Sequence, residues 1–440
     1  MSLEDSASKS TDFDTHVLSG GSHLHVRQST RFKSIWIDVL MPQILRPVAA
    51  TRLALLSRLL ERGTQRLPNL QALNQYTDQL YGAALSAHAT ATGPFQILHL
   101  HFDAMDGAFA PGDGGNQLES GLALLGEVLT DPRVEDGGFS TTRVDQEKAS
   151  LQRYADSLLN DRSWLAQRRC MELMCAGSPW AIAAHGNSAE LSSFSGSDLY
   201  QSLDEFVATA PMDIYVCGNV DPTEVEDLCS RHLSLGNGAT RQVHSPMPVL
   251  QPACAPRQII EHSQVSQGRL VLGFRTPLRL GAADAEYANL VLLNLLLGGD
   301  AHSRLYSRIR EERGLCYHIG SYLEPMAGLL LVEAGVEPED HRAVVAGALA
   351  ELQDLGTTGP STAELERTRA LAKQRLETAE DGRESLVRFH HARLLATTGT
   401  DRMALHSALS MVTPESIRSL AADIVLDTEY FLGPDPELPC

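Results

Sequence analysis

Apolar residues recur at helical spacing in two widely separated stretches of the chain. Residues 52–64 read RLALLSRLLERGT, a pattern that places leucines along one face of a helix. The same spacing returns 237 positions later, at residues 290–297. The matching leucines are Leu53, Leu55, Leu56, Leu59 and Leu60, then Leu290, Leu292, Leu293, Leu296 and Leu297. A repeat at so long a period predicts a duplicated domain and not a solenoid of short repeats.

A second pair of segments supports the duplication. Residues 147–177 parallel residues 369–399, and both patterns are typical of long helical segments that close at a glycine. Short apolar runs typical of strands, such as HLHVRQ and SIWIDVL in the first half and RLVLGFR in the second, alternate with the helical patterns. Each half is therefore predicted to be an α+β layer, a sheet with helices, and the two halves to be homologous.

Polar and proline-rich stretches mark the domain boundaries. Residues 238–256 contain four prolines and no helical period, as in an interdomain linker. This places an N-terminal domain at 13–237 and a C-terminal domain at 257–440. Residues 1–12 are polar, and the beginning of the sequence lacks the apolar core of a secretory signal. We expect these residues to form a mobile tail.

Composition narrows the function classes. The chain has 440 residues, 43% hydrophobic and 21% charged, and no run of about 18 apolar residues that would cross a bilayer. Its formal charge of −19 disfavours nucleic acid and anionic membrane surfaces as partners. The seven cysteines form no CxxC pair, which argues against a disulfide framework and a cysteine zinc cluster. We expect a cytoplasmic protein.

A search for catalytic motifs finds little. Neither HExxH nor HxxEH occurs, and there is no GxSxG, P-loop or GxGxxG pattern. His99, His101 and Asp103 would share one face of a strand, where two imidazoles could contact one metal ion. The alternative is an ordinary half-exposed strand face, which the spacing alone favours.

The stretch LLLGGDAHSRLYSRIREERGLCYHIGSY carries a more specific pattern. It predicts a helix over about 302–312, followed by a glycine turn and a strand. Arg310 and Tyr317 could then project towards one cleft. There the guanidinium of Arg310 and the hydroxyl of Tyr317 could donate hydrogen bonds to a peptide carbonyl. The alternative, favoured by spacing alone, is that Arg308, Arg310 and Arg313 form a solvated helix face paired with neighbouring glutamates.

This stretch resembles the C-terminal-domain signature of the pitrilysin and mitochondrial processing peptidase family of zinc metallopeptidases. Further segments, from LERGTQRLPNLQ to NVDPTEVEDLCSRHL, resemble the N-terminal half of that family in order. The resemblance covers most of the chain, with the tails and linker outside it. It implies a clam-shell chamber built from four homologous domains, of which this chain would supply two, or one half.

The zinc motif of active members is missing at the matching positions. The resemblance aligns HxxEH on the helix before Gly63-Thr64, where this chain has Ala54, Ser57 and Arg58. Ala54 and Arg58 take the places of the two histidine ligands, and Ser57 that of the general base. The third ligand of the family, a glutamate after an E-K pair, is absent because residues 152–154 read Gln-Arg-Tyr. We expect no metal and no cofactor on this chain, and no peptidase activity from it alone.

The retained part of the machinery suggests a role beside an active partner. Arg310 and Tyr317 match the family's arginine and tyrosine that reach into the opposing zinc site. The resemblance therefore implies a noncatalytic subunit that completes the chamber of a heterodimeric peptidase and positions peptide for a homologous, zinc-bearing HxxEH subunit. A homodimer in isolation is also compatible. The alternatives are a scaffold or peptide-binding homologue without a catalytic partner, or an independent peptidase with a metal at His99 and His101.

Overall fold

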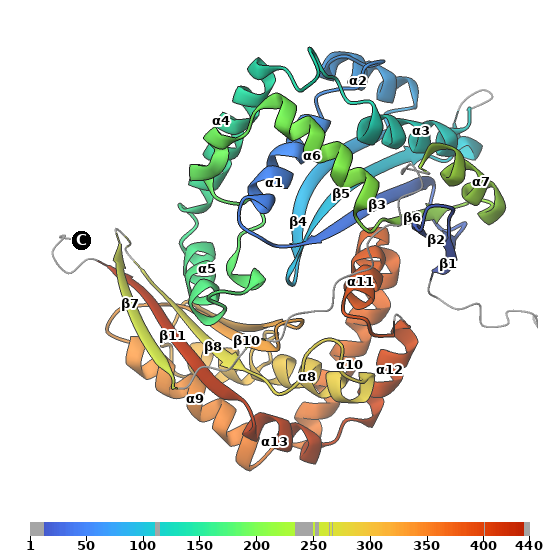
Figure 1. The fold of residues 1–440 in the computed structure, drawn as a ribbon. Helices are drawn as coiled ribbons and strands as arrows, with labels where there is room; N and C mark the ends of the chain where they lie inside the picture. Colours follow the sequence, from blue (N-terminus) through green and yellow to red (C-terminus); the bar gives the residue numbers. More distant parts are fainter. Residues whose placement is uncertain are drawn as a thin grey trace, which may run out of the picture. The chain divides into compact units, whose positions relative to one another are not determined.

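The computed structural model describes residues 13–110, 115–233, 250, 255–263, 265, 267–399 and 401–434. Contacts divide the chain into two compact units. The first contains described residues from 1–156 and 182–245, and the second contains those from 157–181 and 246–440. Each unit has one mixed sheet with helices (Figure 1). Among the described residues, no helix is long and apolar enough to span a membrane.

The first unit is built on a six-stranded sheet of order β1-β2-β6-β3-β5-β4, in which only β2 and β6 pair in parallel. Its strands are β1 (Asp14–Val17), β2 (His23–Gln28), β3 (Ser34–Ile44), β4 (Ala84–Thr92), β5 (Phe95–Met105) and β6 (Asp213–Gly218). Its helices are α1 (Ala49–Leu60), α2 (Leu70–Gln79), α3 (Gln117–Thr130), α4 (Thr141–Leu158), α6 (Gly196–Thr209) and α7 (Pro222–His232), with short turns η1 (Gly107–Phe109) and η3 (Ser188–Ser193).

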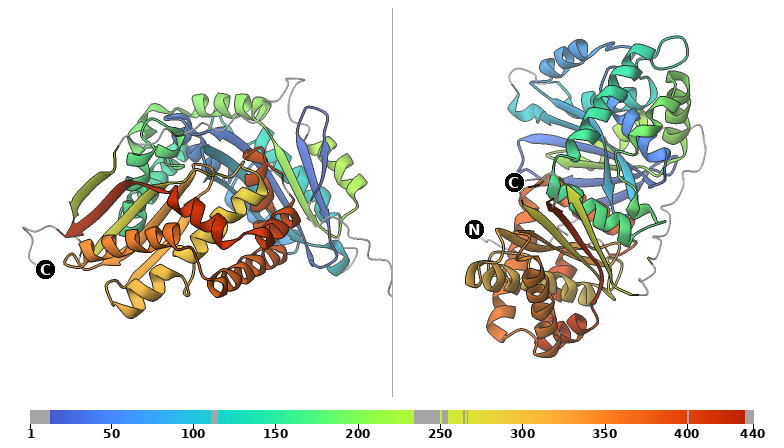
Figure 2. Two further views of the ribbon diagram at one scale, coloured as in Figure 1. Left: turned by 90° about the horizontal axis from the view of Figure 1, so that it is seen from below. Right: turned by 90° about the vertical axis from the view of Figure 1, so that its left-hand side faces the viewer.

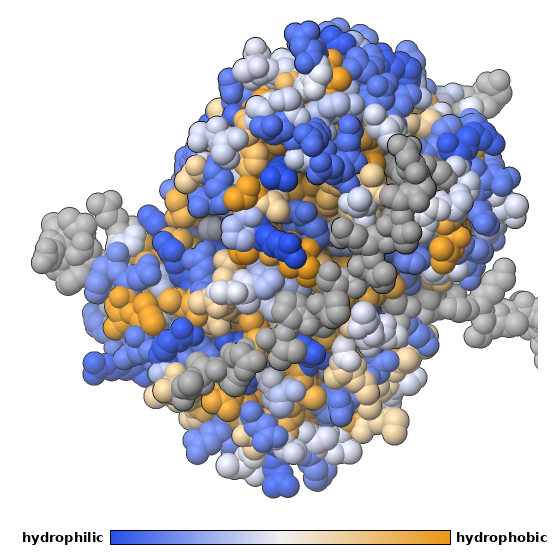
Figure 3. Space-filling view, viewed as in Figure 1, coloured by the Kyte–Doolittle hydropathy of each residue, from blue (hydrophilic) through white to orange (hydrophobic). Residues whose placement is uncertain are grey.

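Helices α1 and α3 cover one face of this sheet. A Cβ on Gly121 of α3 would lie 2.4 Å from the ring of Phe102, so this glycine allows the helix to approach the strands closely. On the same face, Gln96 of β5 donates a hydrogen bond to the carbonyl of Ala50 in α1 at 2.8 Å. The outer surface over α2, α3 and α7 is mainly hydrophilic (Figure 3), as expected for helices that bury one face only.

The second unit has a five-stranded sheet of order β7-β11-β8-β10-β9, with most helices on one face and α5 on the other (Figure 2). Its strands are β7 (Arg257–Ser263), β8 (Gly268–Arg275), β9 (His318–Glu324), β10 (Leu329–Val336) and β11 (Val425–Pro434). Its helices are α5 (Arg162–Met174), α8 (Asp284–Leu297), the π-helix η4 (Leu305–Glu312), α9 (His341–Thr357), α10 (Thr362–Thr378), α11 (Arg383–Leu395), α12 (Arg402–Met411) and α13 (Pro414–Ala422), with short turns η2 (Pro179–Ala181) and η5 (Ala379–Asp381).

The two sheets repeat one topology. The order β2-β6-β3-β5-β4 of the first unit corresponds to β7-β11-β8-β10-β9 of the second, and β7 pairs with β11 in parallel as β2 does with β6. The leucine helices α1 and α8 occupy matching places. Helix α1 follows β3 along the chain, and α8 follows β8, which is the strand that corresponds to β3. The predicted α+β class with two homologous sheet-and-helix domains is confirmed, and β1 is an additional edge strand of the first unit.

The domain boundaries differ from the prediction in one respect. Residues 157–181, placed in an N-terminal domain of 13–237, belong to the second unit. The reason is packing, because α5 lies against β8 and β11, and a Cβ on Gly273 of β8 would collide with Met174. The tail 1–12 lies outside the described residues, as does most of the predicted linker 238–256.

Candidate functional site

The three degenerate motif positions line one cavity of the first unit. Ala54, Ser57 and Arg58 of α1 border a cavity of about 230 Å³, together with residues 87–89 of β4 and Tyr154 of α4. Ala54 and Ser57 are buried. The hydroxyl of Ser57 donates to the carbonyl of Ala54 at 3.0 Å and so satisfies a helix carbonyl. A serine hydroxyl engaged in this way does not act as a general base.

Arg58 is held by α4. Its guanidinium lies 5.5 Å from the ring centre of Tyr154 and donates to the hydroxyl of Ser150 at 3.2 Å. Tyr154 in turn meets the ring of His185 edge-on, at 6.0 Å between centroids. The structure thus identifies Tyr154 as a residue of 152–154 that faces the α1 motif. The resemblance assigns a histidine ligand to the position of Arg58, and a cation there would repel zinc.

Glutamates near this cavity are already engaged. Glu61, just after α1, accepts a hydrogen bond from the backbone N–H of Ala87 at 2.9 Å. Ala87 belongs to β4, an edge strand of the sheet, so this carboxylate covers one of its free donors. Glu147 of the E-K pair is buried and accepts from Arg62 at 2.7 Å. Arg58 and Arg62 thus tie α1 and the residues after it to α4, while Oε2 of Glu147 is buried without a hydrogen-bond partner among the described residues.

Replacing Arg58 or Tyr154 by alanine is expected to destabilise the first unit by about 1 kcal/mol each, since each change removes the same cation–π contact. Because the residues interact directly, the double variant should lose less than the sum of the single losses. Urea unfolding of the four proteins in this cycle measures the coupling. Strictly additive losses would contradict a direct Arg58–Tyr154 interaction.

The second unit carries Arg310 on η4. Its side chain is 34% exposed and lies 3.4 Å from a carboxylate oxygen of Glu311. The guanidinium also lies 4.5 Å from the ring centre of Tyr306. The predicted helix over 302–312 is realised as η4, with Leu305 buried. The Arg310–Glu311 pair is the kind of contact that a solvated helix face would make. Because both side chains are accessible, the pair is weak and leaves Arg310 able to bind another group.

Tyr317 directly precedes β9 and is 62% exposed. Its hydroxyl donates to Glu337 at 2.9 Å, and this hydrogen bond to a carboxylate raises the pKa of Tyr317 above its usual value. Within the described residues, Arg310 and Tyr317 make no hydrogen bond, ion pair or ring contact with each other. Both are surface groups with exposed partners, and their convergence on one substrate stays a prediction.

The strand histidines are placed as predicted, but their carboxylate is a different one. His99 and His101 of β5 share a face, and both contact Asp38 of the neighbouring strand β3. Asp103 stands opposite Trp36 in the same register and is not part of this group. Sequence reasoning missed Asp38 because strand pairing and register are set over 60 residues of separation, and no local pattern signals them.

Comparison with known proteins places the chain in a class. Residues 193–371 match the domain family described as "Peptidase M16 inactive domain". The "Probable inactive metalloprotease YmfF" of Bacillus subtilis is 27% identical over 416 residues, which cover 94% of this chain and 96% of that protein. The chain is thus a relative of the M16 peptidases, and the resemblance predicted from its sequence is confirmed.

Solved structures share the fold over nearly the whole chain. A conserved protein from Enterococcus faecalis V583 superposes with a TM-score of 0.86 and 21% identity, over 97% of this chain and all of that one. The periplasmic protease PqqL from Escherichia coli superposes with a TM-score of 0.70 and 15% identity, over 96% of this chain but only 46% of its own. At these identities the likeness concerns the fold alone.

The comparisons and the cavity agree on the chemical class. The matched domain and the Bacillus relative are both described as inactive, and Ala54, Ser57, Arg58 and Tyr154 supply neither the ligands nor the base of a zinc peptidase. The chain is therefore similar to M16 relatives that are described as inactive, and these four side chains do not form a zinc-peptidase ligand set.

Proposed function

We propose that the chain is the noncatalytic subunit of a two-chain zinc peptidase. It completes the chamber and positions peptide for a homologous subunit that carries HxxEH and zinc. The observation that carries this proposal is the contrast between the two units. The first has replaced the zinc motif by Arg58 and Tyr154, whereas the second keeps Arg310 and Tyr317 on the surface, where packing does not require them. A cytoplasmic location belongs to the same proposal.

The length of the relatives supports a paired arrangement. PqqL is a single chain about twice as long as the part that this chain matches. A chain of this fold therefore corresponds to half of that longer protease. We infer that a second, homologous chain supplies the other half. The two chains would then pair as the two halves of the longer protease do.

The chemistry of the retained pair fits the role of substrate holder. An arginine fork and a tyrosine hydroxyl donate hydrogen bonds to a peptide carbonyl and to the oxyanion that forms on it. Neither group activates water, so the pair is useful only beside a metal-bound water from another chain. The proposed activity therefore requires both chains.

A peptide-binding homologue without a catalytic partner is the second candidate. The edge strand β4 borders the cavity at residues 87–89, and edge strands accept peptides by backbone pairing. Glu61 occupies the N–H of Ala87, so a peptide would have to displace this side chain. This candidate predicts peptide binding by the isolated chain that strengthens when Glu61 is replaced by alanine.

The test is reconstitution with the HxxEH homologue encoded in the same genome. We expect no hydrolysis of a quenched fluorescent peptide library by this chain, and hydrolysis by the mixture that far exceeds that of the partner alone. Replacing the partner's HxxEH glutamate by glutamine should abolish the activity. If the partner alone is as active as the mixture, the subunit proposal is wrong. If peptide binds to this chain without any partner, the second candidate gains support.

A further inference from the structure

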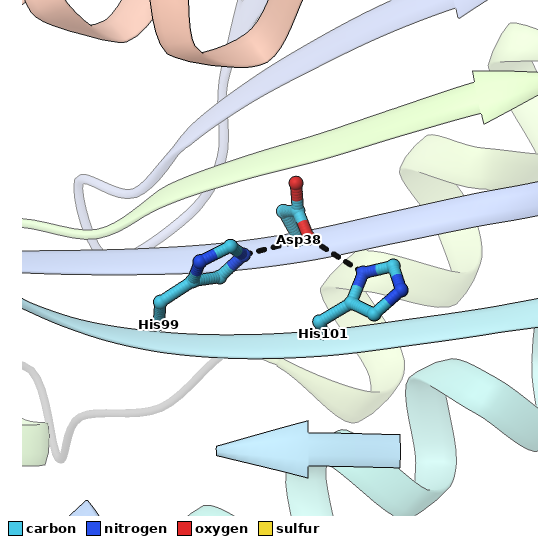
Figure 4. Close-up of side chains that lie close together, drawn as sticks. All are labelled: Asp38, His99 and His101. Atoms are coloured by element: carbon cyan, nitrogen blue, oxygen red, sulfur yellow. Dashed lines mark hydrogen bonds and ion pairs between the residues drawn. The ribbon is translucent and has the colours of Figure 1, made fainter. Parts of the chain in front are cut away.

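The face of the first sheet that points away from α1 and α3 carries a cluster of two imidazoles and one carboxylate (Figure 4). His99 Nε2 and His101 Nδ1 each lie 2.8 Å from the same oxygen, Oδ1 of Asp38. Asp38 and His101 are direct partners in the β3–β5 register. Since side chains alternate along a strand and Gln96 faces α1, His99 and His101 lie on the opposite face.

Asp38 is fully buried. Its exposed fraction is 0%, whereas the His99 and His101 side chains are 18% and 15% exposed. A carboxyl group at this depth requires hydrogen-bonding partners, and His99, His101 and Trp36 supply them. Because both imidazoles are partly exposed, the group can be reached from solvent.

The second carboxylate oxygen is fixed by its own donor. The indole N–H of Trp36 donates to Asp38 Oδ2 at 2.7 Å, and the Trp36 ring packs 4.0 Å from the His101 ring. Oδ1 is thereby aimed at the histidines. Hydrogen bonds of this kind orient carboxylate ligands in metal sites. His88 of β4 lies beside His99, at 4.6 Å between ring centroids, and adds a further imidazole to this face.

We propose that Asp38, His99 and His101 bind one divalent transition-metal ion of the zinc type. Each residue offers one ligand atom, and the three atoms lie within 4.8 Å of one another. Zinc holds nitrogen and oxygen ligands at about 2.0–2.2 Å, which places neighbouring ligand atoms of a tetrahedral site about 3.3–3.6 Å apart, so the two histidine–Asp38 contacts of 2.8 Å would lengthen slightly on binding. The imidazoles favour zinc, cobalt or nickel over magnesium or calcium.

The proposed ligands lie on the face of the sheet opposite α1, and His88, which also lines the motif cavity, stands beside them. The metal site does not depend on the proposed subunit role. Three protein ligands leave at least one coordination position for water or a further group. In the competing arrangement there is no metal, and each histidine donates a hydrogen bond to Asp38.

The test is isothermal titration of the tag-free, chelator-treated chain with Zn²⁺, and a parallel titration with Co²⁺ followed by visible absorption. We expect one ion per chain, with cobalt bands typical of a site with nitrogen and oxygen ligands, and no binding of Mg²⁺. His99→Gln removes a partly exposed ligand and should weaken binding by at least about 100-fold. Trp36→Phe keeps the ligands but frees Oδ2, and should weaken binding by about 10- to 100-fold.

His302→Gln is the matched control, because His302 is an exposed histidine of the second unit and should leave the affinity unchanged. Thermal melting of each variant without metal establishes that the chain is folded. If a variant does not fold, X-ray absorption of the cobalt-loaded wild-type chain should show two imidazoles and one carboxylate. Absence of binding to the wild-type chain, or equal affinities in wild type and His99→Gln, would overturn the proposal in favour of the metal-free arrangement.

Discussion

Replacement of Arg310 by alanine is expected to lower kcat/KM of the reconstituted two-chain peptidase about 100-fold, the usual cost of losing one donor to a developing oxyanion. The chain should stay folded, because the Arg310 side chain pairs with the exposed Glu311 and packs on the ring of Tyr306. Exposed pairs of this kind contribute at most about 1 kcal/mol. Steady-state hydrolysis of a fluorogenic peptide by the purified complex measures the effect.

Two further variants separate function from stability. Tyr317→Phe removes only a hydroxyl that is bonded to Glu337 at the surface, and should lower kcat/KM by about 10- to 100-fold. Arg308→Ala is the matched control on the same helix, since Arg308 is bound to Glu351 at 2.6 Å within the second unit. Equal activities of Arg310→Ala and Arg308→Ala would show that these arginines are a solvated helix face.

The second large effect concerns Glu324 at the end of β9. Burial raises the pKa of this carboxyl from 4.5 to about 7, and no ion-pair partner for it exists among the described residues. Between these two pH values the folded chain holds a proton that the unfolded chain releases, so stability falls as pH rises. A shift of this size corresponds to a loss of about 3 kcal/mol above pH 7.

Glu324→Gln removes the titrating group and should therefore stabilise the second unit by up to about 3 kcal/mol at pH 8, with no gain below pH 4.5. Urea unfolding of both proteins from pH 4.5 to 8 measures the difference. Glu339→Gln, an exposed carboxyl of the same unit, should show no such pH dependence. A gain that is equal at all pH values would contradict burial of an ionisable Glu324.

The duplicated fold could be predicted because its signals are local. The leucine spacing of residues 53–60 and 290–297 identifies two matching helices, and the structure places both in the same position of one strand topology. The membership of α5 could not be predicted. Its apolar pattern indicates that one face of the helix is buried, but its packing on β8 and β11 depends on contacts across about 100 and about 250 residues of sequence.

For the candidate site too, the sequence shows residue types but not the contacts between distant segments. The absence of HxxEH is visible in the sequence directly, and the resemblance assigns the motif positions to Ala54, Ser57 and Arg58. That Tyr154 faces Arg58 depends on how α4 is rotated against α1. Likewise, the pairing of Asp38 with His101 depends on sheet register, because a shift by one residue would move Asp38 to the helix-covered face.

The central claim is that this chain works beside a zinc-bearing homologue. Native mass spectrometry of the chain, purified from its own host at endogenous level, tests this claim most directly. The account predicts a one-to-one complex with a homologue whose sequence contains HxxEH, and loss of peptidase activity when the two chains are separated. Recovery of this chain alone, or paired only with itself, under conditions that preserve weak complexes would contradict it.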